Sequence, residues 1–345
     1  MARNTEAKGG LAGLGWRAFF AQQTDIDEME RTPPVRVTQV HRNGLYVLGE
    51  EIEALVPPGP DATVGDWLMY DTDAPARSRV LERISIIKRR SAGLERRMQS
   101  IAANIDTTFI VTSCNNDFNL ARLERYIALA LEAETQPVIV LTKPDLAEDA
   151  DRYAEEAGSI SDLVPVVVVN AKGGGVSEAL AAWCGAGQTV AFLGSSGVGK
   201  STLTNALAAG ADVATQEVRE DDARGRHTTT RRQLHFVPGG CAVLDTPGMR
   251  ELQLADAEAG IGDLFSDLRD LATECKFNDC AHESEPGCAV LAAVERGEID
   301  AARLARWKKL VAEERFNTES LTDRRMRDRA FGKMVKRTIK GSRKR

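Results

Sequence analysis

The stretch TVAFLGSSGVGKSTLTNAL, residues 189–207, indicates the fold of the surrounding domain because it has the pattern of a strand, a glycine-rich loop and a helix. Four of its residues match the phosphate-loop spacing G-x-x-x-x-G-K-S. Glycines let backbone N–H groups close around a phosphate at a helix N-terminus, while the lysine reaches the β- and γ-phosphates and the serine can bind Mg²⁺. We therefore expect a nucleotide at Gly194, Ser195, Ser196, Gly197, Val198, Gly199, Lys200, Ser201 and Thr202.

The phosphate loop belongs to a longer run of alternating strands and helices. Continuous Val, Ile and Leu runs separated by helices predict a parallel sheet buried on both faces, in an α/β domain over residues 105–255. The last two strands are separated only by PGG, so we expect an antiparallel hairpin at one edge of the sheet. The expected strands are 106–113, 137–142, 164–169, 189–194, 233–237 and 241–245, and the expected helices are 119–134, 145–158 and 175–183.

Two segments that each end a predicted strand favour guanine over adenine. TKPD contains Thr142, Lys143 and Asp145, and the carboxylate of Asp145 can accept hydrogen bonds from N1–H and the 2-amino group of guanine. The aliphatic stem of Lys143 can lie along the base. At the end of the next strand, the N–H of Ala171 can meet guanine O6, and its neighbours there are Asn170 and Lys172.

The remaining pieces of the expected site follow the phosphate loop. DTPG places Asp245 and Gly248 in the D-x-x-G spacing, where Asp245 belongs to the Mg²⁺ shell and the N–H of Gly248 meets the γ-phosphate. GRHTTT, residues 225–230, offers the hydroxyl of Thr229 as a Mg²⁺ ligand. A threonine-rich loop without a role is the alternative for that segment.

These elements occur in the order 4, 5, 1, 2, 3 relative to a Ras-like chain, and a sheet positions loops in space rather than in sequence. The chain resembles the circularly permuted, ribosome-small-subunit-dependent GTPases, the RsgA or YjeQ family. The resemblance covers about residues 35–315. Two positions differ from the family, with Thr142 in place of Asn and Asn170 in place of Ser, which puts the hydrogen bonds that brace the loops in doubt. The resemblance rests on VGD (64–66), AANID (102–106), TKPD, GSSGVGKS, GRHTTT, DTPG and a cysteine cluster.

The resemblance also implies how hydrolysis proceeds. Ras-like enzymes orient the attacking water with a Gln after D-x-x-G, but Met249 stands there and cannot do so. The resemblance implies that a switch-loop histidine replaces this Gln, and His227 matches that position. A solvent-exposed loop histidine is the alternative interpretation. The catalytic residues are then His227, Lys200 and Thr229.

The cysteine cluster CKFNDCAHESEPGC, residues 275–288, predicts a metal site. Three thiolates and one imidazole within fourteen residues fit a closed Cys₃His zinc site, hence one structural Zn²⁺. Its ligands are Cys275, Cys280, His282 and Cys288. Cys114, Cys184 and Cys241 are expected to be ordinary buried residues. This zinc-binding helical domain is assigned to residues 256–315.

The N-terminal part predicts a second domain. Residues 1–33 form a polar lead-in, and five short strand-like runs over residues 34–90 fit an OB-type barrel, with an SH3-like barrel or a plain meander as alternatives. The basic stretch KRRSAGLERRMQ, residues 88–99, leads from the barrel to the next domain, and the connector is assigned to residues 91–104. The stretch either contacts phosphate or forms a solvated helix face.

Charge is distributed unevenly. The net charge is −6, but Arg324–Arg345 contains eleven Lys or Arg and one acid, so this tail carries +10 and the remainder −16. A basic tail over residues 316–345 indicates a polyanionic partner or a solvated end. No apolar run is long enough for a signal peptide or a spanning helix, so we expect a cytoplasmic protein without membrane contact.

Together the residues and the resemblance predict a monomeric GTPase that binds GTP/GDP, the small ribosomal subunit and its rRNA, and assists late maturation of that subunit. A GTP-dependent switch acting on a protein client is one alternative. A nucleotide-binding RNA module with little hydrolysis is the other.

Overall fold

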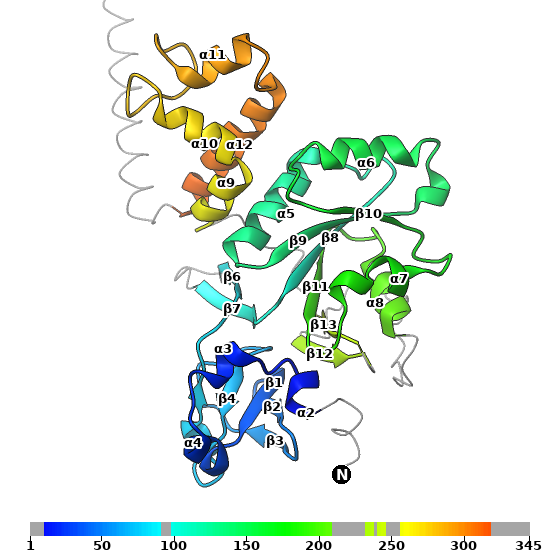
Figure 1. Cartoon of the computed structure of the whole chain (residues 1–345), viewed down its shortest axis with the longest axis vertical. Helices are drawn as coiled ribbons and strands as arrows, with labels where there is room; N and C mark the ends of the chain where they lie inside the picture. The colour runs from blue at the N-terminus through cyan, green and yellow to red at the C-terminus, as the bar shows by residue number, and fades with distance from the viewer. Residues whose placement is uncertain (1–9, 91–97, 209–231, 238–239, 246–255, 319–345) are drawn as a thin grey trace, which may run out of the picture.

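The computed structural model describes residues 10–90, 98–208, 232–237, 240–245 and 256–318. Figure 1 shows three regions along the longest axis: strands and short helices near the N-terminus, a sheet covered by helices, and a helical region near the C-terminus. One eleven-stranded sheet runs through the first two regions, in the order β10-β9-β8-β11-β13-β12-β1-β2-β3, with β4 and β5 branching from β1.

The middle of this sheet is parallel, as predicted. The phosphate-loop strand β11 lies between β8 and β13, and β9 and β10 follow on the side of β8. These strands are β8 (Thr107–Ser113), β9 (Gln136–Thr142), β10 (Val166–Val169), β11 (Thr189–Leu193) and β13 (Ala242–Asp245). The helices are α5 (Leu120–Glu132), α6 (Ala150–Gly158), α7 (Val176–Ala179) and α8 (Lys200–Ala208).

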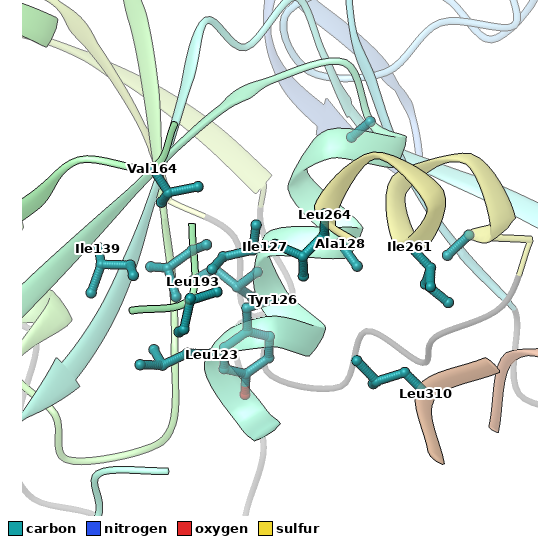
Figure 2. Close-up of a cluster of buried hydrophobic side chains, with 14 of the residues drawn as sticks. Leu123, Tyr126, Ile127, Ala128, Ile139, Val164, Leu193, Ile261, Leu264 and Leu310 are labelled. Atoms are coloured by element: carbon teal, nitrogen blue, oxygen red, sulfur yellow. The ribbon is translucent and has the colours of Figure 1, made fainter. Parts of the chain in front are cut away.

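Both faces of the parallel strands are buried, which explains their unbroken apolar sequences. On one face, Ile139 and Leu193 pack against Leu123 and Ile127 of α5 (Figure 2). On the other face, a second cluster joins the strands to α7 and α8. Two helices are shorter than predicted: α6 begins at Ala150 because Asp149 caps it by accepting from the N–H of Arg152 at 3.1 Å, and α7 ends in a 3₁₀ turn over Ala181–Trp183.

Strand β12 (Arg232–Phe236) forms the predicted antiparallel hairpin with β13, but the prediction that this hairpin lies at a sheet edge is wrong. Strand β1 (Pro34–His41) pairs with β12 through Gln39–Gln233 and Val40–Arg232. With eight residues, β1 is long enough to pair its first part with β4 and its last part with β12. The backbone edge that an isolated hairpin would expose is thereby covered.

The N-terminal strands form a partly open, five-stranded barrel. Strand β1 pairs with both β2 (Gly44–Leu48) and β4 (Trp67–Met69), which excludes a plain meander. Among the described residues, strand β3 (Glu53–Val56) pairs only with β2 and strand β5 (Arg79–Val80) only with β4, so no pairing between β3 and β5 closes the barrel there. This arrangement fits an OB-type barrel.

The lead-in is folded onto the barrel rather than trailing from it. Its helices are α2 (Gly10–Gly13), α3 (Ala18–Ala21) and α4 (Ile26–Arg31). Leu14 and Phe20 are fully buried beside Trp67, and the ring of Trp16 meets that of Trp67 edge-on with centroids 4.9 Å apart. Trp16 and Phe20 of GWRAFF therefore join a second hydrophobic cluster with Trp67, Met69 and Leu81 of the N-terminal region.

The described ends of the basic connector are two paired strands, where the sequence allowed a solvated helix face. Strand β6 (Ile86–Arg90) pairs antiparallel with β7 (Met98–Ala103). Alternating burial explains the difference, because Ile87 and Ile101 point into the core while Lys88 is exposed. The helix alternative is therefore wrong for residues 88–90 and 98–99, while residues 91–97 lie outside the described residues.

Arg36 joins the lead-in, the barrel and the parallel sheet. Its fully buried guanidinium donates to Leu14 O and to Thr189 Oγ1, the latter at 2.8 Å. Two further acceptors, the carbonyl oxygens of Asn104 and Gly65, lie at 3.2 and 3.4 Å. Burial lowers the pKa of Arg36 to about 10, so the group stays charged at neutral pH.

The C-terminal helices are α9 (Glu258–Leu264), α10 (Ser266–Thr273), α11 (Ala289–Glu295) and α12 (Ala301–Thr318). They contact α5 through α9 and α12. Gly260 lets α9 approach α5 closely, since a Cβ there would lie 2.0 Å from Ala128 O. Arg306 of α12 pairs at 2.8 Å with Glu124 of α5, whose side chain is fully buried.

Replacing Arg36 by methionine should lower the free energy of unfolding by about 2–5 kcal/mol, because several buried acceptors lose their donor. Urea unfolding followed by circular dichroism measures this change. The matched substitution Arg152→Met, in an exposed ion pair of α6, should change stability by less than about 1 kcal/mol. Equal stabilities of the two variants would contradict the role of Arg36.

Candidate nucleotide site and metal centre

The loop between β11 and α8 has a backbone that requires glycine. Gly194 has φ of 155°, and a Cβ there would lie 2.2 Å from Val111 O. Gly199 has φ of 104° immediately before α8 begins at Lys200. The loop therefore curls at a helix N-terminus, where N–H groups are available to an anion.

Lys200 points back into this loop. Its Nζ donates to Gly194 O at 2.7 Å and to Ser195 O. The ammonium is thus held among the loop carbonyls, in the position from which it can reach a phosphate. Ser201 is exposed in the first turn of α8.

The end of β9 meets the phosphate loop, although the two segments are more than fifty residues apart. Thr142 is fully buried, with its Oγ1 2.5 Å from Val198 O and 3.2 Å from Thr112 O. Lys143 adopts φ of 57°, and its Nζ donates to Gly197 O at 2.8 Å. Asp145 is exposed on the following 3₁₀ turn.

The turn after β10 is braced by Asn170. Its Oδ1 accepts from the N–H groups of Lys172 and Gly173 at 3.0 and 3.1 Å. The two departures from the family pattern, Thr142 and Asn170, thus both make loop-bracing hydrogen bonds here. Ala171 lies at this turn, at the end of a strand parallel to β9.

Part of the predicted site lies outside the described residues. His227, Thr229, Gly248 and Met249 belong to this part, as does the tail Arg324–Arg345. Asp245 is the last residue of β13, and its backbone pairs with Gln233. Because β13 is parallel to β11, the chain leaves β13 at the same sheet edge as the phosphate loop.

Comparisons with known proteins agree with this geometry. Residues 80–255 match the family model of the RsgA GTPase. The chain is 45% identical to the small ribosomal subunit biogenesis GTPase RsgA 2 of Vibrio parahaemolyticus, over 97% of this chain and 94% of the relative. It is 50% identical to RsgA of Mesorhizobium japonicum, over 91% and 92%.

This chain belongs to the RsgA GTPase family. Two solved structures are similar to it. YjeQ from Thermotoga maritima is 28% identical with a TM-score of 0.59, over 81% of this chain and 97% of YjeQ. YloQ, described as a circularly permuted GTPase, is 26% identical with a TM-score of 0.56, over 83% and 96%. The permuted GTPase fold predicted from the motif order is confirmed.

VGD and AANID, two motifs of the RsgA resemblance, form the junction between barrel and sheet. Asp66 is buried, accepts from Thr63 N at 2.7 Å and pairs with Arg83 at 2.7 Å. Asn104 has φ of 56°; its Oδ1 accepts from Ile84 N at 2.9 Å, and its Nδ2 donates to Gly65 O at 3.0 Å. Their role is therefore to fix the two parts together.

The four predicted metal ligands converge, with all their ligand atoms within 4.8 Å of one another. His282 Nδ1 lies 3.3 Å from Cys288 Sγ and 3.7 Å from Cys275 Sγ, and these two sulfurs are 3.9 Å apart. A tetrahedral zinc ion with ordinary bond lengths separates sulfur pairs by about 3.8 Å and sulfur–nitrogen pairs by about 3.5 Å. The set fits zinc.

The surroundings of His282 suit a metal ligand. Burial lowers the pKa of His282, which favours the neutral imidazole that binds metals. Glu285 shapes the loop by accepting from the N–H groups of Glu283 and Ala281 at 2.8 and 2.9 Å, and these backbone bonds lower its pKa to about 2. Trp307 of α12 covers the His282 ring, with centroids 5.5 Å apart.

The other three cysteines lie elsewhere. Cys114 and Cys241 are buried as expected, but Cys184 is only partly buried because it lies in the turn after α7. Among the helices in the described ranges, none combines the length and the apolar character needed to cross a bilayer.

Replacing Thr142 by valine should weaken GTP and GDP binding together by about 1–2 kcal/mol, because a buried carbonyl of the phosphate loop loses its donor. Isothermal titration calorimetry measures both affinities. Thr142→Ser keeps the hydroxyl and should stay close to the parent protein. If Thr142→Val bound GTP and GDP as tightly as the parent protein, Thr142 would not be needed to support the phosphate loop.

Protein prepared without chelators should contain about one zinc ion per chain, measured by atomic emission. Removing it should increase hydrogen exchange over residues 274–290 before the sheet domain unfolds, since a structural site supplies local folding energy. Cys280→Ser should reproduce the effect, and Cys114→Ser should leave the zinc content unchanged. Absence of zinc would contradict the assignment.

Proposed function

We propose that this chain is a GTPase that binds the small ribosomal subunit, assists its late maturation, and hydrolyses GTP to GDP and phosphate on docking. One observation carries the nucleotide part: Thr142 and Lys143 of the base-recognition segment contact the carbonyls of the phosphate loop. Base and phosphate groups of one nucleotide can thus be held by a single rigid edge of the sheet. Membership of the RsgA family supports the ribosomal part.

We assign the residues of this edge to the parts of GTP. The loop 194–202 surrounds the phosphates, and Lys200 exchanges its carbonyl partners for phosphate oxygens. Asp145 and the N–H of Ala171 recognise guanine, with Lys143 along the base and Asn170 and Lys172 shaping the turn. Ser201, Thr229 and Asp245 would hold Mg²⁺, which supplies charge neutralisation at the phosphates. Gly248 meets the γ-phosphate, and His227 orients water.

The remaining assignments concern partners and organisation. Barrel, zinc-binding region and the tail Arg324–Arg345 provide the rRNA contacts, and the zinc ion is structural. We retain the predicted domain limits, a monomer and a cytoplasmic location as parts of the proposal. The family supports the ribosomal partner, and the convergent Cys₃His ligands support the zinc.

Purified small subunits should raise GTP turnover at least about tenfold, because Met249 leaves the free enzyme without the usual water-orienting Gln. Phosphate release with and without subunits measures this, and large subunits serve as the control. Lys200→Ala should abolish both rates. A rate of GTP turnover that small subunits do not change would instead favour a GTP-dependent switch acting on a protein client.

A further inference from the structure

Two arginines meet where the β6–β7 hairpin touches strand β12. Arg89 lies on β6 opposite Gln99, and Arg232 is the first residue of β12. Arg232 Nη1 donates to Ser100 O of β7 at 2.9 Å. The guanidinium of Arg232 is thereby held against the hairpin that carries Arg89.

The electrostatics of this pair are unfavourable in the protein alone. Burial lowers the pKa of Arg232, and the positive charge of Arg89 lowers it further. Arg89 Nε is buried and has no hydrogen-bond partner in the part of the chain that the structure describes. Within the described ranges, neither arginine forms an ion pair with a carboxylate. Two adjacent cations and an unused buried donor are costly unless an anion joins them.

We propose that Arg89 and Arg232 bind a phosphate group of an RNA backbone. The inference rests on the proposed function and gives it a specific contact. Guanidinium groups match phosphate oxygens with paired donors, and arginine is preferred at such sites. RNA is favoured over an acidic peptide because the chain adjoining Arg89 is strongly basic, with Lys88 exposed and further arginines at positions 90, 96 and 97. Apart from its tail the chain is acidic, so this basic segment is a local concentration of positive charge. Such a concentration favours binding of a polyanion.

The position of Arg232 connects this contact to hydrolysis. Strand β12 follows residues 209–231, which contain His227 and Thr229, and it pairs with β13, which ends at Asp245. Strand β12 therefore begins where one switch segment ends and is hydrogen-bonded to the strand that leads to the other. A phosphate bound to Arg232 would fix the start of β12, which directly follows in the chain the segment that carries the expected water-orienting group.

The test compares Arg89→Ala, Arg89→Lys and Arg232→Lys with Arg152→Ala, which removes one exposed arginine on α6. Binding to purified small subunits is measured by sedimentation across a salt series. For Arg89→Ala we expect weaker binding to small subunits. The slope of log affinity against log salt, which is negative, should become less steep by about 0.7–1, the value of one phosphate contact. Arg89→Lys should fall between it and the parent protein, while Arg152→Ala should match the parent.

Stimulation of GTP turnover is the second readout. The ratio of stimulated to basal rate, at saturating small subunits, should fall at least about threefold in Arg232→Lys and Arg89→Ala. Melting temperatures show whether each variant is folded. Parental salt slopes and parental ratios in folded variants would overturn the proposal while leaving the GTPase assignment intact.

A fluorescent oligouridylate of about twelve nucleotides tests the site without the ribosome. Arg89→Ala should bind it more weakly and with a flatter salt dependence than Arg152→Ala. If small subunits fail to stimulate the parent protein, the proposed function fails, and this RNA then decides the phosphate site alone. A site for free phosphate is indicated by two results together. Inorganic phosphate would raise the melting temperature of the parent protein but not that of Arg89→Ala, and the two proteins would bind the RNA equally well. That result, or a loss of subunit binding without a change of salt slope, would overturn the RNA assignment.

Discussion

The buried guanidinium of Arg36 is the interaction on which the arrangement of the N-terminal half depends. Its N–H groups donate to the lead-in, to the junction between barrel and sheet, and to the phosphate-loop strand. The acceptors are Leu14 O, Gly65 O, Asn104 O and Thr189 Oγ1. A charge in such a place is tolerated only if its donors are satisfied. Every segment that supplies an acceptor is therefore held in one position, and Thr189, the first residue of β11, is among them.

The neighbouring contacts extend this constraint. Asp106 accepts from Thr189 N at 2.7 Å and pairs with Arg17 at 2.8 Å, so a carboxylate lies near the buried cation. Gly65 leaves room for Ala103 O, which a Cβ would approach to 2.0 Å. Pairing of β1 with β12 adds a second tie, at the hairpin that separates the two switch segments. Barrel and GTPase sheet thus behave as one hydrogen-bonded unit.

The parallel sheet and the phosphate loop could be predicted because they depend on local patterns. Buried strands between helices have unbroken apolar runs, and G-x-x-x-x-G-K-S has one structural meaning after a strand. Convergence of the cysteine cluster was equally predictable, since its four ligands lie within fourteen residues. The order of the motifs indicated the permutation. The structure agrees, because the strands that bear these motifs are neighbours in the sheet although their order along the chain is changed.

Features that depend on partners distant in sequence could not be predicted. The pairing of β12 with β1 joins residues almost two hundred positions apart, and nothing in QLHFV distinguishes an edge strand from a covered one. The β6–β7 hairpin was hidden by its charges, because KRRSAGLERRMQ has few apolar residues to show a period of two. Likewise the lead-in is polar on average, and only its contact with Trp67 of the barrel explains why Phe20 is buried and Trp16 is partly buried.

The shared strand β1 has a consequence for how the protein can be divided. A fragment that starts at residue 105 keeps every motif of the nucleotide site, yet it loses the strand that covers β12. The bare backbone of β12 would then be free to pair with another copy, and Thr189 Oγ1 would lose the donor that Arg36 supplies. The boundary that sequence motifs suggest between the barrel and the enzyme is therefore a poor place to cut the chain. For this molecule, the smallest soluble GTPase should include the barrel.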